Sequence, residues 1–195
     1  MSHPNREPYT DQACLDFMRN RFAPSWAPLD WKQAAGLVSF IMAVREHFPK
    51  GNDVTMAEIG TSAGESGVMF AASGIFSKIY HIDAWCAEYS NEAGKKICEY
   101  NLKPYPQSEM IHRDMFELEL GWKEEVDIIY LDADHTYPEV KKGLEAWDKH
   151  LKVGGIWAGH DYTSVWPGVI QAVDEFFPDS EIRKFADSSW MVVKK

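Results

Sequence analysis

Residues 54–67 read VTMAEIGTSAGESG, a β-favouring run followed by a glycine-rich turn and a stretch of small residues. Gly60 lets the chain turn sharply and lets a ligand approach the backbone, while Gly64 and Gly67 let the next helix pack close to a sheet. The order of strand, glycine-rich turn and helix predicts a ligand-binding loop at the carboxyl edge of an α/β sheet.

Strand and helix patterns alternate beyond this loop. Because βαβ alternation favours a parallel sheet with helices on both faces, we expect a Rossmann-like α/β fold. The last two strand-like stretches are joined by only a few residues, too few for a parallel crossover, and predict an antiparallel hairpin at the sheet edge. The predicted strands are 54–59, 78–82, 109–113, 126–131, 156–158, 182–185 and 190–193, and the predicted helices run through 76 and over 91–102, 136–151 and 167–177.

The first 53 residues predict helices rather than strands. Residues 11–22 are loosely amphipathic, and a second helix begins after Asp30, which is placed to cap it. We therefore divide the chain into an N-terminal helical segment, 1–53, that acts as a substrate lid or an interface, and one catalytic domain, 54–195. The apolar face expected for the second helix consists of Ala34, Leu37, Val38, Ile41 and Met42.

Composition narrows the class of protein. The 195 residues carry a formal net charge of −10 and no run of Lys or Arg longer than two, which argues against a nucleic-acid partner. The longest apolar stretch is too short to span a bilayer, and the N-terminus does not resemble a signal peptide. Three cysteines without CxxC spacing argue against a disulfide framework, so a reducing cytoplasm is the expected compartment.

The loop differs from the fingerprint of dinucleotide-binding proteins. That fingerprint requires glycine at positions 60, 62 and 65, but the sequence has Ser62 and Glu65, and an acid at position 65 would repel a pyrophosphate. Asp83, at the end of the second predicted strand, is placed to accept hydrogen bonds from both ribose hydroxyls of an adenosine. The pattern favours a nucleoside cofactor without phosphates, with a purely structural turn as the alternative.

These residues resemble a known family. EIGTSAG at 58–64 is similar to the first motif of class I S-adenosylmethionine-dependent methyltransferases. The stretch DIIYLDADHTYPEVKKGLEAWDKHLKVGGIWAGHDY at 127–162, with WPGVIQAVDEFF at 166–177, resembles small methyltransferase domains related to catechol-type and macrolide-sugar O-methyltransferases. The resemblance implies a seven-stranded sheet with an antiparallel last strand. It also implies S-adenosylmethionine as cofactor, bound by Glu58, Gly60, Ser62, Gly64, Asp83, Asp114, Met115 and Asp132.

The same resemblance implies a metal site. Catechol-type relatives hold Mg²⁺ with an acid after strand four and an acid–amide pair after strand five, and Asp132, His160 and Asp161 fall on those positions. A divalent cation would lower the pKa of a substrate hydroxyl and orient it for attack on the methyl group. His160 stands where an acid is expected, which shifts the balance from Mg²⁺ toward Mn²⁺, iron or zinc, or toward no metal with His160 as general base.

We therefore expect an S-adenosylmethionine-dependent methyltransferase that acts on a hydroxyl of a small molecule, with Asp132 and His160 as catalytic residues. Asp134 and His135 are further candidates for contact with a metal or the substrate. The alternatives are an NAD(P)-dependent oxidoreductase and a non-catalytic nucleotide-binding protein. No membrane or nucleic-acid partner is expected, and the short loops leave room for a second subunit of a homodimer to complete the pocket.

Overall fold

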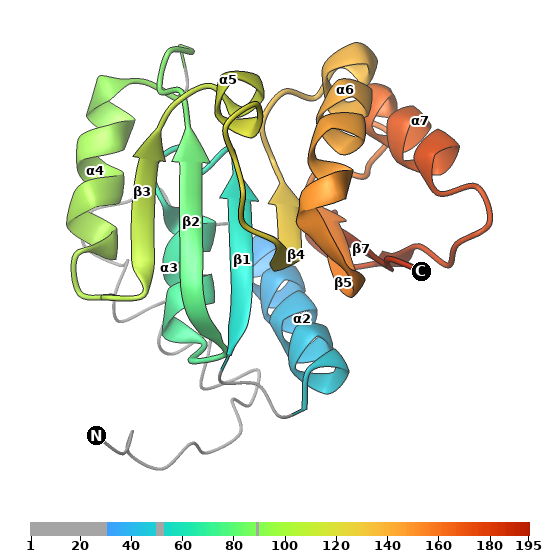
Figure 1. The fold of residues 1–195 in the computed structure, drawn as a ribbon, viewed down its shortest axis with the longest axis horizontal. Coiled ribbons are helices and arrows are strands. Elements are labelled where there is room, and N and C mark those ends of the chain that lie inside the picture. Colours follow the sequence, from blue (N-terminus) through green and yellow to red (C-terminus); the bar gives the residue numbers. More distant parts are fainter. Residues whose placement is uncertain (1–30, 50–52, 89) are drawn as a thin grey trace.

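The structure, a computed structural model, describes residues 31–49, 53–88 and 90–195. Its strands form one seven-stranded sheet in the order β3-β2-β1-β4-β5-β7-β6. β1 to β5 are parallel, and β7 runs antiparallel to both of its neighbours (Figure 1). This confirms the predicted Rossmann-like sheet and its terminal hairpin. The strands are β1 (Val54–Ile59), β2 (Phe76–Asp83), β3 (Ser108–His112), β4 (Val126–Leu131), β5 (Leu151–Gly159), β6 (Arg183–Lys184) and β7 (Trp190–Val193).

Helices cover both faces of the sheet (Figure 1). α2 and α3 pack on one face, and α6 and α7 pack on the other with the short helix α5 beside them. α4 packs beside α3 near the β3 edge. The described helices are α2 (Trp31–His47), α3 (Glu65–Ala72), α4 (Glu92–Leu102), α5 (Met115–Glu119), α6 (Tyr137–Trp147) with the 3₁₀ turn η1 (Asp148–His150), and α7 (Pro167–Phe176).

β4 lies at the centre of the molecule and is buried on both faces. Ile128 and Tyr130 face the core under α2 and α3, where the Tyr130 ring lies 5.4 Å from the Phe40 ring. Ile129 and Leu131 face the core under α6 and α7. Side chains alternate between the faces of a strand, so a continuous apolar run is what a strand between two helical layers requires.

Several predicted boundaries are wrong. The helix predicted through Phe76 ends at Ala72, because Gly74 adopts φ +69° and Phe76 already begins β2. The helix predicted over 136–151 ends at Trp147, and Leu151 begins a strand that is longer than the predicted 156–158. Helix α5 was not predicted. Thr136 precedes α6 as expected but makes no side-chain capping bond.

The described part of the N-terminal segment belongs to the core. Phe40 and Val44 of α2 are fully buried, whereas Met42, which was predicted on the apolar face, is 40% exposed. The predicted helix at 11–22 and the capping residue Asp30 lie outside the described residues. None of the helices in the described part of the chain combines the length and apolarity that crossing a bilayer needs.

The turn after β1 passes unusually close to the end of β4. Gly60 adopts φ +93°, and a Cβ atom at this position would lie 1.9 Å from the carbonyl oxygen of Asp132. The backbone N–H of Gly60 donates to Ile82 at 2.8 Å, and that of Asp132 donates to Ile59 at 2.8 Å. These bonds tie the carboxyl ends of β1, β2 and β4 together. The nearby carbonyl of Asp132 leaves no room for a side chain at position 60.

We predict that Gly60→Ala lowers the free energy of unfolding by about 2–4 kcal/mol, because it adds a backbone clash to the strain of a positive φ. Gly154→Ala is the matched control, since Gly154 also has a positive φ (+78°) but no atom lies within 4 Å of the place that a Cβ would take there. It should cost only about 1–2 kcal/mol. Urea denaturation of both variants measures the difference, and equal losses would contradict the argument.

Candidate active site

The loop from β1 to α3 separates two cavities at the carboxyl edge of the sheet. The smaller has a volume of about 270 Å³ and the larger about 460 Å³. Gly60, Ser62 and Asp132 line both. A ligand that bends over Gly60 can therefore occupy both cavities, and its midpoint then passes Asp132.

The smaller cavity collects most of the predicted adenosine contacts. Asp83, Asp114 and Met115 all line it. Asp83 is already held by protein donors: its Oδ2 accepts from the backbone N–H of Ser62 at 2.8 Å, and its Oδ1 accepts from Trp85 N at 2.7 Å and Ser90 Oγ at 2.9 Å. A carboxylate has about four acceptor positions, so Asp83 fixes the loop and keeps capacity for a ribose hydroxyl.

Asp114 lines the smaller cavity through its role at a helix start. Its carboxylate caps α5, accepting from the backbone N–H groups of Phe116 at 2.9 Å and Glu117 at 3.2 Å. This cap places Met115 and Phe116 on the cavity wall. Phe116 was not predicted; an aspartate two residues before it is the signal that marks such a cap.

Glu58 does not lie where the sequence predicts it. The side chain is fully buried and lines neither cavity. It accepts hydrogen bonds from Ser66 Oγ and from Thr61 Oγ1 (3.3 Å), and it pairs with His81 Nδ1 at 2.6 Å. Glu58 therefore holds the loop and α3 against β2, and its predicted contact with the cofactor stays a prediction. His81, which shows no partner in the sequence, is its buried partner.

Three side chains that could ligate a metal ion converge on the other side of the loop, at the ends of β4 and β5. One ligand atom each from Asp132, His135 and Asp161 lies within 4.8 Å of the other two. His135 Nε2 is buried, 2.9 Å from Asp161 Oδ2 and 3.6 Å from Asp132 Oδ1, yet makes no hydrogen bond of suitable angle to any described residue. The nitrogen thus points at a position shared with the two carboxylates. Asp161 reaches this position through a left-handed backbone (φ +60°), which Asp tolerates better than most residues.

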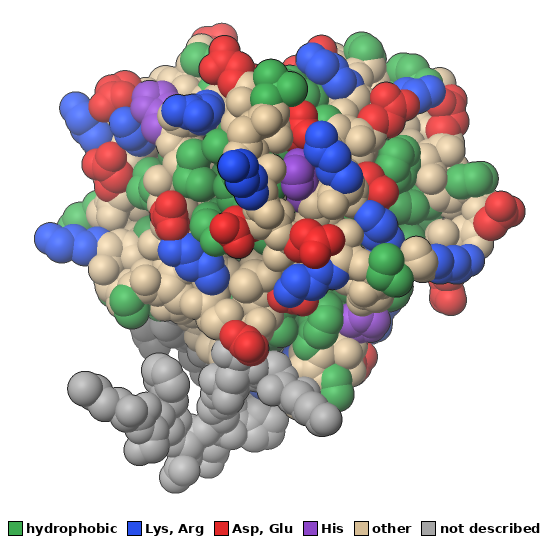
Figure 2. All heavy atoms as spheres, in the orientation of Figure 1, with side chains coloured by type: hydrophobic (Ala, Val, Ile, Leu, Met, Phe, Trp, Pro, Cys, Tyr) green, Lys and Arg blue, Asp and Glu red, His purple; other side chains and the backbone are tan. Residues whose placement is uncertain are grey.

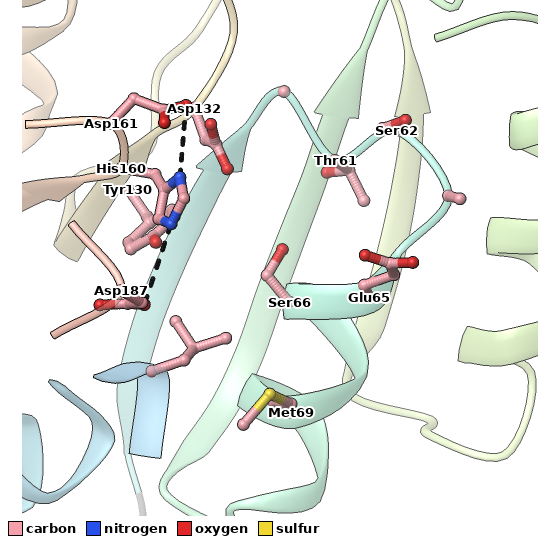
Figure 3. Close-up of a pocket in the computed structure, with 13 residues that line it drawn as sticks. Thr61, Ser62, Glu65, Ser66, Met69, Tyr130, Asp132, His160, Asp161 and Asp187 are labelled. Atoms are coloured by element: carbon pink, nitrogen blue, oxygen red, sulfur yellow. Dashed lines mark ion pairs between the residues drawn. The ribbon is translucent and has the colours of Figure 1, made fainter. Parts of the chain in front are cut away.

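His160 lies beside this cluster, in contact with Asp161, and is not one of the three converging residues, so the predicted set of Asp132, His160 and Asp161 stays a prediction. Its Nδ1 lies 3.3 Å from Asp161 Oδ2 and its Nε2 lies 3.9 Å from Asp187 Oδ2 (Figure 3). Asp187 comes from the turn between β6 and β7, is almost fully buried, and accepts from the backbone N–H and hydroxyl of Ser189. Asp187 was not predicted, because the sequence of a polar hairpin turn carries no signal that the turn folds back over the site.

The carboxylates set the charge of both histidines. Interaction with Asp132 and then Asp161 raises the pKa of His135 to about 10. Burial lowers the pKa of His160, but Asp161, Asp132 and Asp187 outweigh it and raise the pKa to about 9. Burial works against ionised Asp161, but His135 and His160 hold its pKa well below the usual range. Both histidines are therefore protonated at neutral pH.

Aromatic side chains support the loops around the site. Trp85, considered for adenine stacking, is buried and lines neither cavity; its Nε1 donates to the carbonyl of Ser62 at 2.8 Å. Trp166 packs against His135, with ring centroids 4.6 Å apart and an interplanar angle of 35°. Tyr162 bonds to Asp174 at 2.5 Å rather than facing a cavity. Trp85 and Trp166 therefore fix the cofactor loop and His135.

Comparison with known proteins identifies the family. The sequence model of a family described as "Methyltransferase domain" matches residues 57–162, just over half of the chain. A curated relative, "Uncharacterized protein R132" of Acanthamoeba polyphaga mimivirus, is 27% identical over 153 residues, which cover 73% of this chain and 67% of the relative.

Solved structures share the fold at low identity. A caffeoyl-CoA O-methyltransferase-like protein from Staphylococcus aureus has a TM-score of 0.63 at 16% identity, covering 96% of this chain and 93% of its own. An O-methyltransferase from Bacillus cereus, in complex with S-adenosylhomocysteine (SAH), has a TM-score of 0.57 at 16% identity, covering 94% and 90%. An rRNA methylase from Streptococcus thermophilus has a TM-score of 0.59 at 15% identity, covering 79% and 95%.

Family membership decides between the functions that the sequence left open. It confirms the resemblance to class I methyltransferases and removes the nicotinamide-dependent oxidoreductase and the non-catalytic binding protein from consideration. The chain belongs to the methyltransferase-domain family and is an S-adenosylmethionine-dependent methyltransferase.

Proposed function

We propose that the protein methylates a hydroxyl group of a small molecule in the larger cavity. The observation that carries this proposal is the cluster of Asp132, His135 and Asp161 at the carboxyl ends of β4 and β5. Asp132 lines both cavities, so it lies between the expected positions of cofactor and substrate. A carboxylate in this position can accept the proton of a substrate hydroxyl that lies beside the methyl donor.

The three residues then have different roles. The Asp132 carboxylate accepts the proton of the substrate hydroxyl. S-adenosylmethionine, when bound, would supply the methyl group that the hydroxyl oxygen takes, and SAH would be released. His135, protonated at neutral pH, stabilises the negative charge that develops on that oxygen. Asp161 holds the His135 ring by the 2.9 Å ion pair, and the Trp166 ring covers its face. His160, also protonated, contributes positive charge to the cavity wall and is not the general base.

A divalent cation fits the same cluster as an alternative to the proton on His135 Nε2, with Asp132, His135 and Asp161 as its ligands. The unbonded, buried Nε2 of His135 supports this fit. Two carboxylates and an imidazole favour Mn²⁺, iron or zinc over Mg²⁺. When bound, such a cation supplies Lewis acidity that lowers the pKa of a hydroxyl. In this proposal His135 takes the place that was predicted for His160.

The distribution of charge on the surface favours a small-molecule substrate over a nucleic acid. The net charge is −10, and basic and acidic side chains are interspersed on the face seen in Figure 2. Binding to rRNA would call for a continuous basic surface, and likeness to an rRNA methylase at 15% identity concerns the fold alone. Leu37 of α2 lines the larger cavity, which supports a role for the N-terminal segment in holding substrate. We also propose that the protein is a homodimer in the cytoplasm.

The test is a panel of small hydroxylated, aminated and thiolated compounds, assayed for SAH release. We expect release with hydroxyl compounds. Asp132→Asn should lower kcat by about 10²–10⁴-fold, because a positioned proton acceptor contributes that much. The control is Asp179→Asn, an exposed acid outside both cavities, which should keep kcat within about twofold.

Release with amines or thiols alone, or full activity of Asp132→Asn on a hydroxyl substrate, would contradict the proposal. Titration of the same proteins with Mn²⁺ adds a separate measurement. We expect His135→Gln and Asp161→Asn to weaken any Mn²⁺ binding, and His160→Gln to leave it within about threefold.

The charge state of His135 also predicts how stability depends on pH. Its pKa is raised from an unfolded value of about 6.5 to about 10, so its stabilising contribution is complete below pH 6.5 and is lost as pH rises through 10. In the presence of a chelator, the wild type should lose thermal stability between pH 7 and pH 10. His135→Gln should show a smaller loss in differential scanning calorimetry, and parallel curves for the two proteins would refute the assignment.

A further inference from the structure

Acids and histidines alternate in a row that runs from the cofactor loop to the last hairpin. In order, the row consists of Asp132, His135, Asp161, His160 and Asp187, and the closest nitrogen–oxygen distances between successive members are 3.6, 2.9, 3.3 and 3.9 Å. Figure 3 shows its last three members along one wall of the larger cavity. The cluster in the proposed function accounts for the first three members and gives no role to Asp187.

Hydrogen bonds hold Asp187 in place at the end of this row. Its Oδ1 accepts from the backbone N–H of Ser189 at 3.0 Å, and its Oδ2 accepts from Ser189 Oγ at 2.7 Å. The backbone N–H of Tyr162 donates to the carbonyl of Ser188 at 3.0 Å. This bond ties the turn that carries Asp187 to the loop that follows β5.

Helix α2 closes over the same carboxylate. A Cβ atom at Gly36 would lie 2.3 Å from both the backbone nitrogen and Oδ1 of Asp187, so the helix reaches the turn only because position 36 has no side chain. Burying a carboxylate is costly unless an opposite charge lies nearby, and His160 is the cation that faces it. The fold thus places a buried acid beside the ring of His160.

Two acids select one orientation of that ring. Rotation about χ2 of a histidine is roughly two-fold, and a flip exchanges a nitrogen for a carbon on each side of the ring. With Asp161 at Nδ1 and Asp187 at Nε2, only one orientation presents a nitrogen to both carboxylates. The Oδ2 atom of Asp161 is then held between His160 and His135.

We propose that Asp187 is a positioning residue for methyl transfer. It fixes the ring of His160, and that ring in turn fixes the carboxylate of Asp161 beside His135. The inference rests on the proposed role of the cluster of Asp132, His135 and Asp161. It assigns to the last hairpin a part in the reaction that is exerted through His160 and not by contact with the reacting atoms.

Two variants disturb Asp187 in different ways. Asp187→Asn keeps the shape of the side chain and an acceptor for the backbone of Ser189, but it removes the charge that faces His160. Gly36→Ala removes no charge and displaces the turn. The matched control is Gly94→Ala in helix α4, because the only atom near the place of its Cβ is the carbonyl carbon of Ser62, at 4.0 Å. It should keep kcat within about twofold.

Steady-state kinetics tests the proposal, with the compound of the panel above that gives the fastest SAH release, whichever of its atoms is methylated. We expect Asp187→Asn and Gly36→Ala to lower kcat by about 10- to 100-fold, because small misplacements cost rate, and to leave KM within about twofold. His160→Gln should lose a similar factor. Adding Asp187→Asn to His160→Gln should lower kcat no further, because the effect of Asp187 passes through that ring.

Calorimetric titration with SAH shows whether each variant is folded, and we expect unchanged affinity. Three results overturn the proposal: loss of SAH binding by Asp187→Asn, which makes Asp187 a residue of the fold alone; a raised KM with unchanged kcat, which means direct contact with the acceptor; and losses that multiply in the double variant. Methylation of amines or thiols alone, or full activity of Asp132→Asn, contradicts the proposed function but leaves the comparison of Asp187 with His160 readable. The two failures are therefore distinguishable.

Discussion

The contact between Gly60 and the end of β4 sets the geometry of the whole site. With no side chain at position 60, the turn after β1 lies against the carbonyl of Asp132, and hydrogen bonds to Ile82 and from Asp132 close the edge of three strands. The same turn forms the ridge between two cavities. Asp132 consequently lines both cavities, and we propose that the methyl donor and the methyl acceptor meet beside it.

Buried charge around this turn is balanced in two separate ways. On the β2 side, Glu58 is satisfied within the protein by His81, Thr61 and Ser66. On the β5 side, three acids surround His135 and His160, and the pKa values of both histidines rise in response. Paired charges cost far less to bury than isolated ones. The acid at position 65 remains outside both networks, in the first turn of α3.

The fold was largely predictable. The apolar run of β4 identifies a strand buried on both faces, and the short spacing of the last two strands identifies the hairpin. Boundaries were less accurate where one residue changes the backbone: Gly74 ends α3 early, and α5 depends on a cap by Asp114. Asp83, Asp114, Met115 and Asp132 all line the smaller cavity, because carboxyl ends of neighbouring parallel strands meet at one edge, and their contact with the cofactor stays a prediction.

By itself, the sequence determined the sheet and identified the loop after its first strand, because these follow from local periodicity and from glycines at fixed spacing. Only the tertiary structure decided which side chains face each other across that loop. At Asp161 the backbone is left-handed and the carboxylate lies between His135 and His160, whose second nitrogen faces Asp187 in the hairpin turn. Glu58 lies inside the fold and Asp187 folds back from the last turn. Side-chain direction at the end of a strand depends on packing against distant segments, and sequence spacing does not encode it.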